Sequence, residues 1–156
     1  MTTGTYPHTL TMPDLGEVWQ RVRREPAYGA FVLMRVGFTV LPIWFGADKF
    51  ANVLTDWEHY LAPWIVGLIP FSAHTAMLVV GIIEIVAGLA VAIKPRYAAY
   101  VVAAWLAGII ANLLTYSGFY DVALRDFGLL VAALTLARLA AAYDPAWRRR
   151  RAASDA

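Results

Sequence analysis

Long apolar stretches separated by short polar segments dominate this chain. About 20 predominantly apolar residues are enough for a helix to cross a bilayer. Four stretches meet this length, at residues 28–45, 73–93, 97–115 and 122–142. They are near-continuous apolar runs rather than the polar and apolar alternation of barrel strands, and four strands cannot close a barrel. The pattern therefore predicts four transmembrane helices, an all-α integral membrane four-helix bundle.

Composition supports the same class. Hydrophobic residues make up 60% of the 156 residues and charged residues 15%, and the mean hydropathy is +0.57. A soluble domain carries about 25% charged residues, so soluble globular and disordered classes are excluded. The absence of cysteine excludes disulfides, thiolate metal sites and c-type haem attachment. No basic, aromatic-interleaved surface indicates nucleic-acid binding.

The basic residues predict an orientation. Lys and Arg are enriched in cytoplasmic loops of membrane proteins. Nine of the 13 basic residues lie before the first apolar stretch, between the second and third, and after the fourth. These segments share one side of a protein with four spans, so both termini are predicted to be cytoplasmic. Enrichment in alanine and arginine is typical of a high-GC bacterium, which makes the bacterial cytoplasmic (inner) membrane the expected location.

The segments that flank the spans predict contact with lipid. Within residues 1–27, an amphipathic helix is expected at 13–25, because Leu15, Val18, Trp19 and Val22 share one face. Such a helix lies on the inner leaflet, either as a topology anchor or as a docking surface for a cytoplasmic partner. Residues 28–143 form the membrane domain. The tail, 144–156, carries Arg148 to Arg151, which would bind anionic headgroups.

The connection from residue 48 to residue 72 is long, aromatic and interrupted by two prolines. It contains no apolar run long enough for a fifth span, so we expect a re-entrant or interfacial segment at the outer mouth of the bundle. Aromatic residues at this depth form either an interfacial belt or a vestibule for a quinone or another amphiphile. The residues of this candidate vestibule are Trp44, Trp57, Tyr60 and Trp64.

Two ionisable residues lie deep within spans, where such residues mark functional sites by default. Measured from the inner helix ends at about 1.5 Å per residue, Arg35 lies about 10 Å deep and Glu84 about 14 Å. These depths predict an intramembrane pair of Arg35 and Glu84, while Arg138 is shallow enough to reach the headgroups. The pair is either a structural lock on helix register or a group that handles protons or binds an anion.

A second polar cluster is expected at the outer mouth. Its members are Asp48, Lys49, Asn112, Arg125 and Asp126. The three histidines are scattered, and no metal-ligand spacing, phosphate loop or nucleophile–base arrangement is visible. No metal site is expected, and no residue can be named as catalytic. In the third span, small residues at Ala104 and Gly108, and at Ala107 and Ala111, permit close helix packing within the chain or between protomers in a homo-oligomer.

Three segments resemble the DoxX-like membrane proteins across residues 30–142. They are RVGFTVLPIWFGADKF from Arg35, GIIEIVAGLAVAIKPRYAAY from Gly81 and DVALRDFGLLVAAL from Asp121. The first outer loop, KFANVLTDWEHYLAPWIVGLIP, is similar to the YkgB-like branch. The resemblance implies a four-helix bundle of the DoxX type.

DoxX-like proteins are associated with small subunits of thiosulfate:quinone oxidoreductase, or act as membrane partners of superoxide dismutase and sulfurtransferase in oxidative-stress complexes. The resemblance implies roles for Arg35, Gly46, Lys49 and Glu84, which stand at matching positions. Arg125 and Asp126 match the opening of the family's last helix.

Three functions remain open at this point. The missing catalytic set, the basic inner face and the resemblance favour an accessory or anchoring subunit of a membrane redox or oxidative-stress complex. The alternative is a quinone-linked oxidoreductase subunit, which requires a ligand-sized cavity reaching Glu84. A small transporter or proton-conducting oligomer is the third, built on the small-residue stripe of the third span. Whether the chain is itself an enzyme stays open.

Overall fold

The fold was obtained as a computed structural model that describes residues 15–143. The first two residues of the expected amphipathic helix and the basic tail with Arg148 to Arg151 lie outside the described residues. Within the described range the chain is helical and contains no strand. The elements are α1 (Leu15–Arg24), α2 (Pro26–Ala51), the short 3-10 helix η1 (Trp57–Tyr60), α3 (Pro63–Leu68), α4 (Ala73–Ile93), α5 (Pro95–Leu114) and α6 (Tyr120–Tyr143).

Three of these helices are long and apolar enough to cross a membrane: α2 with 26 residues, α4 with 21 and α5 with 20. The chain is therefore a membrane protein with at least these three candidate spans. The remaining long helix, α6, has 24 residues but is not among the three candidate spans. It carries Asp121, Arg125, Asp126 and Arg138 along its length.

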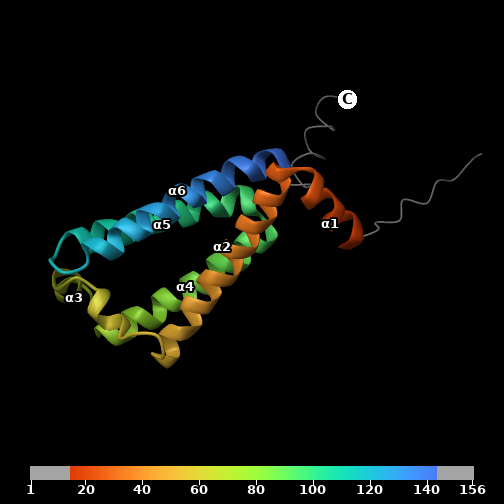
Figure 1. The fold of residues 1–156 in the computed structure, drawn as a ribbon. Helices are drawn as coiled ribbons and strands as arrows, with labels where there is room; N and C mark the ends of the chain where they lie inside the picture. The colour runs from red at the N-terminus through yellow and green to blue at the C-terminus, as the bar shows by residue number, and fades with distance from the viewer. Residues whose placement is uncertain (1–14, 144–156) are drawn as a thin grey trace, which may run out of the picture.

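The long helices form two antiparallel hairpins (Figure 1). Helix α2 packs along α4, and α5 packs along α6, whereas contacts between the two hairpins are much sparser. In Figure 1 the hairpins converge at one end, where α1 and the last turns of α6 lie, and diverge toward the other, where α3 lies. We call these the α1 end and the loop end of the molecule.

Glycines set the close contact between α2 and α4. A Cβ atom on Gly46 would lie 2.5 Å from the carbonyl oxygen of Gly81, and one on Gly88 would lie 2.7 Å from that of Thr39. Only glycine permits backbones to approach this closely in a helix pair. These two contacts fix the antiparallel register of the hairpin, with Gly46 facing Gly81 and Thr39 facing Gly88.

The small residues singled out in the third span do not serve this purpose within the chain. A Cβ atom on Gly108 would meet nothing within 4 Å, and Ala104, Ala107 and Ala111 are exposed. The buried small residues of α5 lie nearer its start, at Ala98, Ala99 and Ala103.

A packed core joins the hairpins at the α1 end. It is built mainly of small and branched side chains, with one phenylalanine. Its buried members are Phe31, Val91, Ala98, Ala99, Val102, Ala103, Ala133, Leu136, Ala137 and Ala140. Tyr143 stacks on Phe31 with the ring centroids 6.0 Å apart. The core closes the space between the hairpins at this end and leaves the loop end to other residues.

Helix α1 joins the same end of the molecule. The Arg21 guanidinium lies 4.2 Å from the ring centroid of Tyr28 and 5.7 Å from that of Tyr143. Leu15 and Trp19 are exposed, while Val18 and Val22 are half-buried. The expected amphipathic helix is thus present over residues 15–24, with part of its apolar stripe free to contact lipid.

Candidate binding site between the hairpins

A cavity of about 690 Å³ lies between the hairpins, toward the loop end. Ligand cavities in proteins measure about 300–1,000 Å³, so its size suits a small molecule. All four long helices and the loop with η1 contribute to its wall, which consists almost entirely of apolar side chains. The few polar groups that reach it therefore decide what it can hold.

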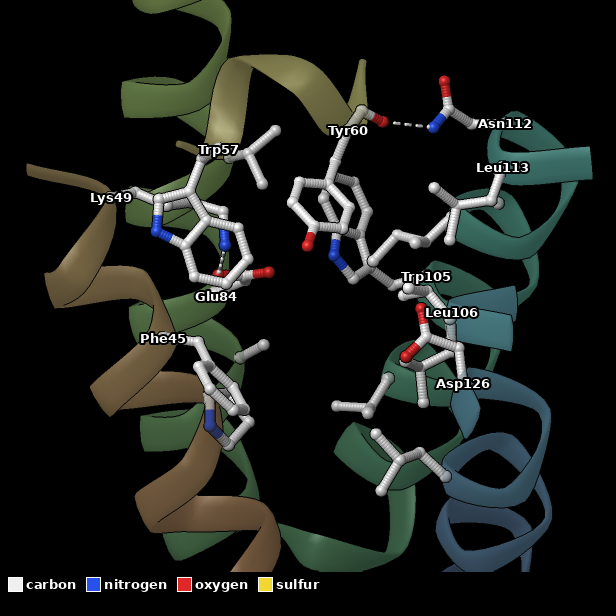
Figure 2. A pocket seen from close by; sticks show the side chains of 18 of the residues that line it. Phe45, Lys49, Trp57, Tyr60, Glu84, Trp105, Leu106, Asn112, Leu113 and Asp126 are labelled. Atoms are coloured by element: carbon white, nitrogen blue, oxygen red, sulfur yellow. Dashed lines mark hydrogen bonds and ion pairs between the residues drawn. The ribbon is translucent and has the colours of Figure 1, made fainter. Parts of the chain in front are cut away.

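One wall carries a buried ion pair. The Lys49 ammonium donates to the Glu84 carboxylate at 2.7 Å, and the two side chains are only 4% and 14% exposed. The Lys49 Nζ also lies 3.8 Å from the ring centroid of Trp57, a cation–π contact. Figure 2 shows the pair on the wall formed by α2 and α4, beside the Trp57 ring.

The glycine contact makes room for this lysine. A Cβ atom on Gly81 would lie 3.2 Å from the Lys49 Cβ, so the stem of Lys49 passes over the glycine. From there the side chain runs along α4 to Glu84, one helical turn further on. The close approach of the two helices and the ion pair are therefore parts of one arrangement.

The predicted pair of Arg35 and Glu84 is wrong. The Arg35 guanidinium instead donates to the carbonyl oxygen of Ala92. The register set by the glycines places Arg35 level with Ala92, eight residues beyond Glu84 along α4. Eight residues of helix span about 12 Å, so Arg35 lies too far from Glu84 to pair with it. Lys49, in the last turn of α2, pairs with Glu84 instead and reaches it from the loop end.

Four of the five residues of the predicted outer polar cluster line the cavity, namely Lys49, Asn112, Arg125 and Asp126. The first three of these each bond to a different partner. Asp48, buried at the end of α2, accepts hydrogen bonds from the backbone N–H groups of Val53 and Leu54 and from the Trp57 indole at 2.8 Å. It fixes the turn after α2 and holds Trp57 over the cavity. Arg125 lines the cavity and forms an exposed pair with Asp121 at 3.0 Å.

Asn112 joins the loop rather than a charged cluster. Its amide Nδ2 donates to the carbonyl oxygen of Tyr60 at 2.7 Å, and its Oδ1 accepts from the N–H of Ala62 at 2.9 Å. Nearby, the Tyr116 hydroxyl donates to the carbonyl oxygen of His59. Burial raises the pKa of the Tyr116 phenol. These bonds attach the loop with η1 to the end of α5, so that it covers the loop end of the cavity.

The opposite wall contributes Trp105 and Asp126 (Figure 2), besides Asn112 and Arg125, which also line the cavity. The Trp105 indole N–H is buried and has no hydrogen-bond partner among residues 15–143. Asp126 also lines the cavity and is half-buried. A buried donor without a partner costs about 1–3 kcal/mol, and a ligand oxygen could satisfy it. Sequence reasoning missed Trp105; its one available signal was a lone indole in the middle of a span rich in alanine.

Half of the predicted aromatic vestibule lies in the cavity wall. Trp57 and Tyr60 line the cavity, while Trp44 and Trp64 do not. Trp44 is exposed on α2. The Trp64 indole donates to the Thr115 hydroxyl at 2.9 Å and so helps attach α3 to the end of α5.

The arrangement suits binding rather than metal chemistry. Within the part of the chain that the structure describes, no three histidine or carboxylate side chains gather closely enough to hold a metal ion. What the cavity offers is an apolar volume with an ion pair on one side and, on the other, an indole donor, a carboxylate and the Arg125 side chain.

Comparison with family models, curated proteins and solved structures finds no match to this chain. The similarity to DoxX-like proteins therefore remains a prediction from the sequence motifs.

Replacing Asn112 should loosen the loop that covers the cavity. Asn112→Leu removes both bonds to residues 60 and 62 and leaves two backbone groups without their partner, at a cost of about 2 kcal/mol. Hydrogen exchange should rise across residues 57–68 and remain unchanged in α2 and α4. Arg125→Gln, which removes an exposed ion pair with Asp121, is the control and should leave exchange in the loop unchanged. Equal exchange in both variants would contradict the role of Asn112.

Proposed function

We propose that the chain is a DoxX-like membrane protein that serves as the quinone-binding subunit of a membrane redox complex. The observation that carries the proposal is the cavity, which reaches Glu84 as a quinone-linked subunit requires. A quinone has an apolar ring with carbonyl oxygens at two opposite positions. The cavity offers an apolar volume with donors from Lys49 on one wall and Trp105 on the other.

The two expectations derived from the sequence combine in this proposal. The absence of a self-contained catalytic set favours a subunit that works with partners, including those of oxidative-stress complexes. The cavity favours a subunit with a ligand of its own over a pure anchor. The Lys49–Glu84 pair then has a function besides fixing the helices, because it supplies the polar contact for the head group.

The proposal includes four spans in a bacterial inner membrane, with α6 as the fourth. Helix α6 runs antiparallel to α5 along its length, and α1 lies beside the last residue of α6, Tyr143. Both features support a chain that enters and leaves the bundle on the same side. The basic residues before α2 and at the turn from α4 into α5 support a cytoplasmic location for that side.

Binding of a quinone ring tests the proposal. Nanodiscs that contain the protein should retain a chain-free dimethoxy-methyl-benzoquinone above the level of empty nanodiscs, in a saturable manner. Ala104→Phe places a ring in the cavity and should weaken binding at least about tenfold, since overfilling a packed site costs about 1–3 kcal/mol. Retention is measured by equilibrium dialysis.

The matched control is Ala107→Phe. Ala107 is exposed on the same helix and does not line the cavity, so its variant should bind as the parent does. No saturable retention by the parent, or equal loss in both variants, would refute the proposal.

A further inference from the structure

The cavity is closed at both ends of the bundle. At the α1 end the packed core of Phe31, Val91 and Leu136 fills the space between the hairpins. At the loop end Trp57, Tyr60 and Leu61 line the cavity from above, and Asn112 holds their backbone in place. A ligand that enters along the bundle axis would have to displace one of these two groups. The remaining route runs sideways, between the hairpins.

The side between α2 and α6 offers that route. Leu41 on α2 and Leu129 on α6 line the cavity and yet are 47% and 38% exposed. Phe45 on α2 is likewise exposed. On the side of α4 and α5, Met77 is buried and Val80 half-buried, and the only exposed lining residues of these two helices are the small residues Ala104 and Gly108. The cavity therefore reaches the surface of the protein between α2 and α6, through apolar side chains.

We infer that the ligand carries a hydrocarbon chain, enters from the bilayer between α2 and α6, and leaves its chain in that opening when bound. The inference rests on the proposed function. Because α2 is a candidate span, the opening beside Leu41 faces hydrocarbon rather than water. An apolar chain can lie there while the head group reaches Lys49 and Trp105 inside.

The apolar opening favours a lipid-soluble ligand over a water-soluble molecule with the same head group. A polar molecule would have to pass through an apolar opening set in the membrane, where unpaired polar groups are costly. A lipid-soluble molecule is already in the bilayer at the required depth. Leu41, Leu129 and Phe45 act as positioning residues, because they contact the chain and not the head group.

The test narrows the opening without filling the cavity. The double variant Leu41→Trp/Leu129→Trp places two indoles at the opening. Its matched control is Leu33→Trp/Leu124→Trp, on the same two helices at exposed positions that do not line the cavity. Two probes are compared in nanodiscs: a benzoquinone with a decyl chain and the same ring without the chain, each expressed as a mole fraction in the bilayer.

We expect the narrowed variant to bind the decyl form at least about tenfold more weakly than the control does, because the chain must then overfill the opening. Its affinity for the chain-free ring should stay within about twofold of the control. Unchanged affinity for the decyl form would overturn the inference, as would an equal loss for both probes. Failure of the unmodified protein to bind either probe would instead refute the proposed function.

Discussion

Lys49→Met should destabilise the protein more than any other single change in the cavity wall. The variant leaves the Glu84 carboxylate, 14% exposed among apolar side chains, without its cation. Removing one partner of a buried ion pair costs about 3–5 kcal/mol, because the remaining charge is left uncompensated. We therefore expect the free energy of unfolding to fall by about 3 kcal/mol or more. Reversible unfolding in mixed micelles with increasing denaturing detergent measures the change.

Two further variants separate this effect from a general loss of charge. Lys94→Met removes the other lysine of the chain, which is exposed between α4 and α5, and should change stability little. The double variant Lys49→Met/Glu84→Leu replaces the pair by apolar groups and should recover most of the loss. If Lys49→Met costs no more than Lys94→Met, the buried pair is not formed in the membrane.

Gly81→Ala should push α2 and α4 apart and destabilise the hairpin that they form. An alanine Cβ at this position would lie 2.7 Å from the carbonyl oxygen of Gly46, and a backbone atom cannot yield unless the helices separate. Overpacking of this kind costs about 1–3 kcal/mol. The gain in helix propensity from glycine to alanine, about 1 kcal/mol, offsets only part of this cost. We expect a net loss of up to about 2 kcal/mol in the free energy of unfolding.

Gly108→Ala makes the same chemical change where an added Cβ meets nothing within 4 Å. This control should leave stability unchanged or raise it slightly, since only the propensity gain remains. Equal effects of Gly81→Ala and Gly108→Ala would show that the close contact between α2 and α4 does not stabilise the protein.

The apolar stretches predicted the long helices well. The stretch at 73–93 corresponds to α4, and the stretch at 97–115 covers all but the first two residues of α5. Helix α2 extends beyond its predicted apolar stretch, 28–45, to Ala51. The polar residues Asp48 and Lys49 remain helical because one carboxylate accepts the backbone N–H groups beyond the helix end and the lysine turns toward Glu84.

The partner of Glu84 could not be predicted from depth alone. Counting residues from the helix ends places Arg35 and Glu84 at similar depths, but it assumes that both helices begin at the same level. The true register depends on which glycines meet, Gly46 with Gly81. In that register Lys49 lies beside Gly81, and its long side chain reaches Glu84 about one helical turn further along α4. Such contacts follow from packing, which a hydropathy pattern does not contain.

The presence of the cavity could not be predicted from the sequence either. It exists because the two hairpins pack together through small residues at the α1 end and diverge toward the loop end. The sequence of each helix would be the same whether the hairpins were packed along their whole length or diverged. Its apolar residues suit lipid, a packed core and a cavity wall alike. Of the residues expected in the vestibule, Trp57 and Tyr60 line the cavity and Trp44 and Trp64 do not, and Trp105 was missed.

The most direct test of the central claim is a crystal structure grown from a lipid mesophase with a brominated decyl-benzoquinone. The account predicts an anomalous bromine peak inside the cavity, the head group between the Lys49–Glu84 pair and the Trp105 indole, and the chain between α2 and α6. A filled or collapsed space between the hairpins, with bromine only at the lipid-facing surface, would contradict it.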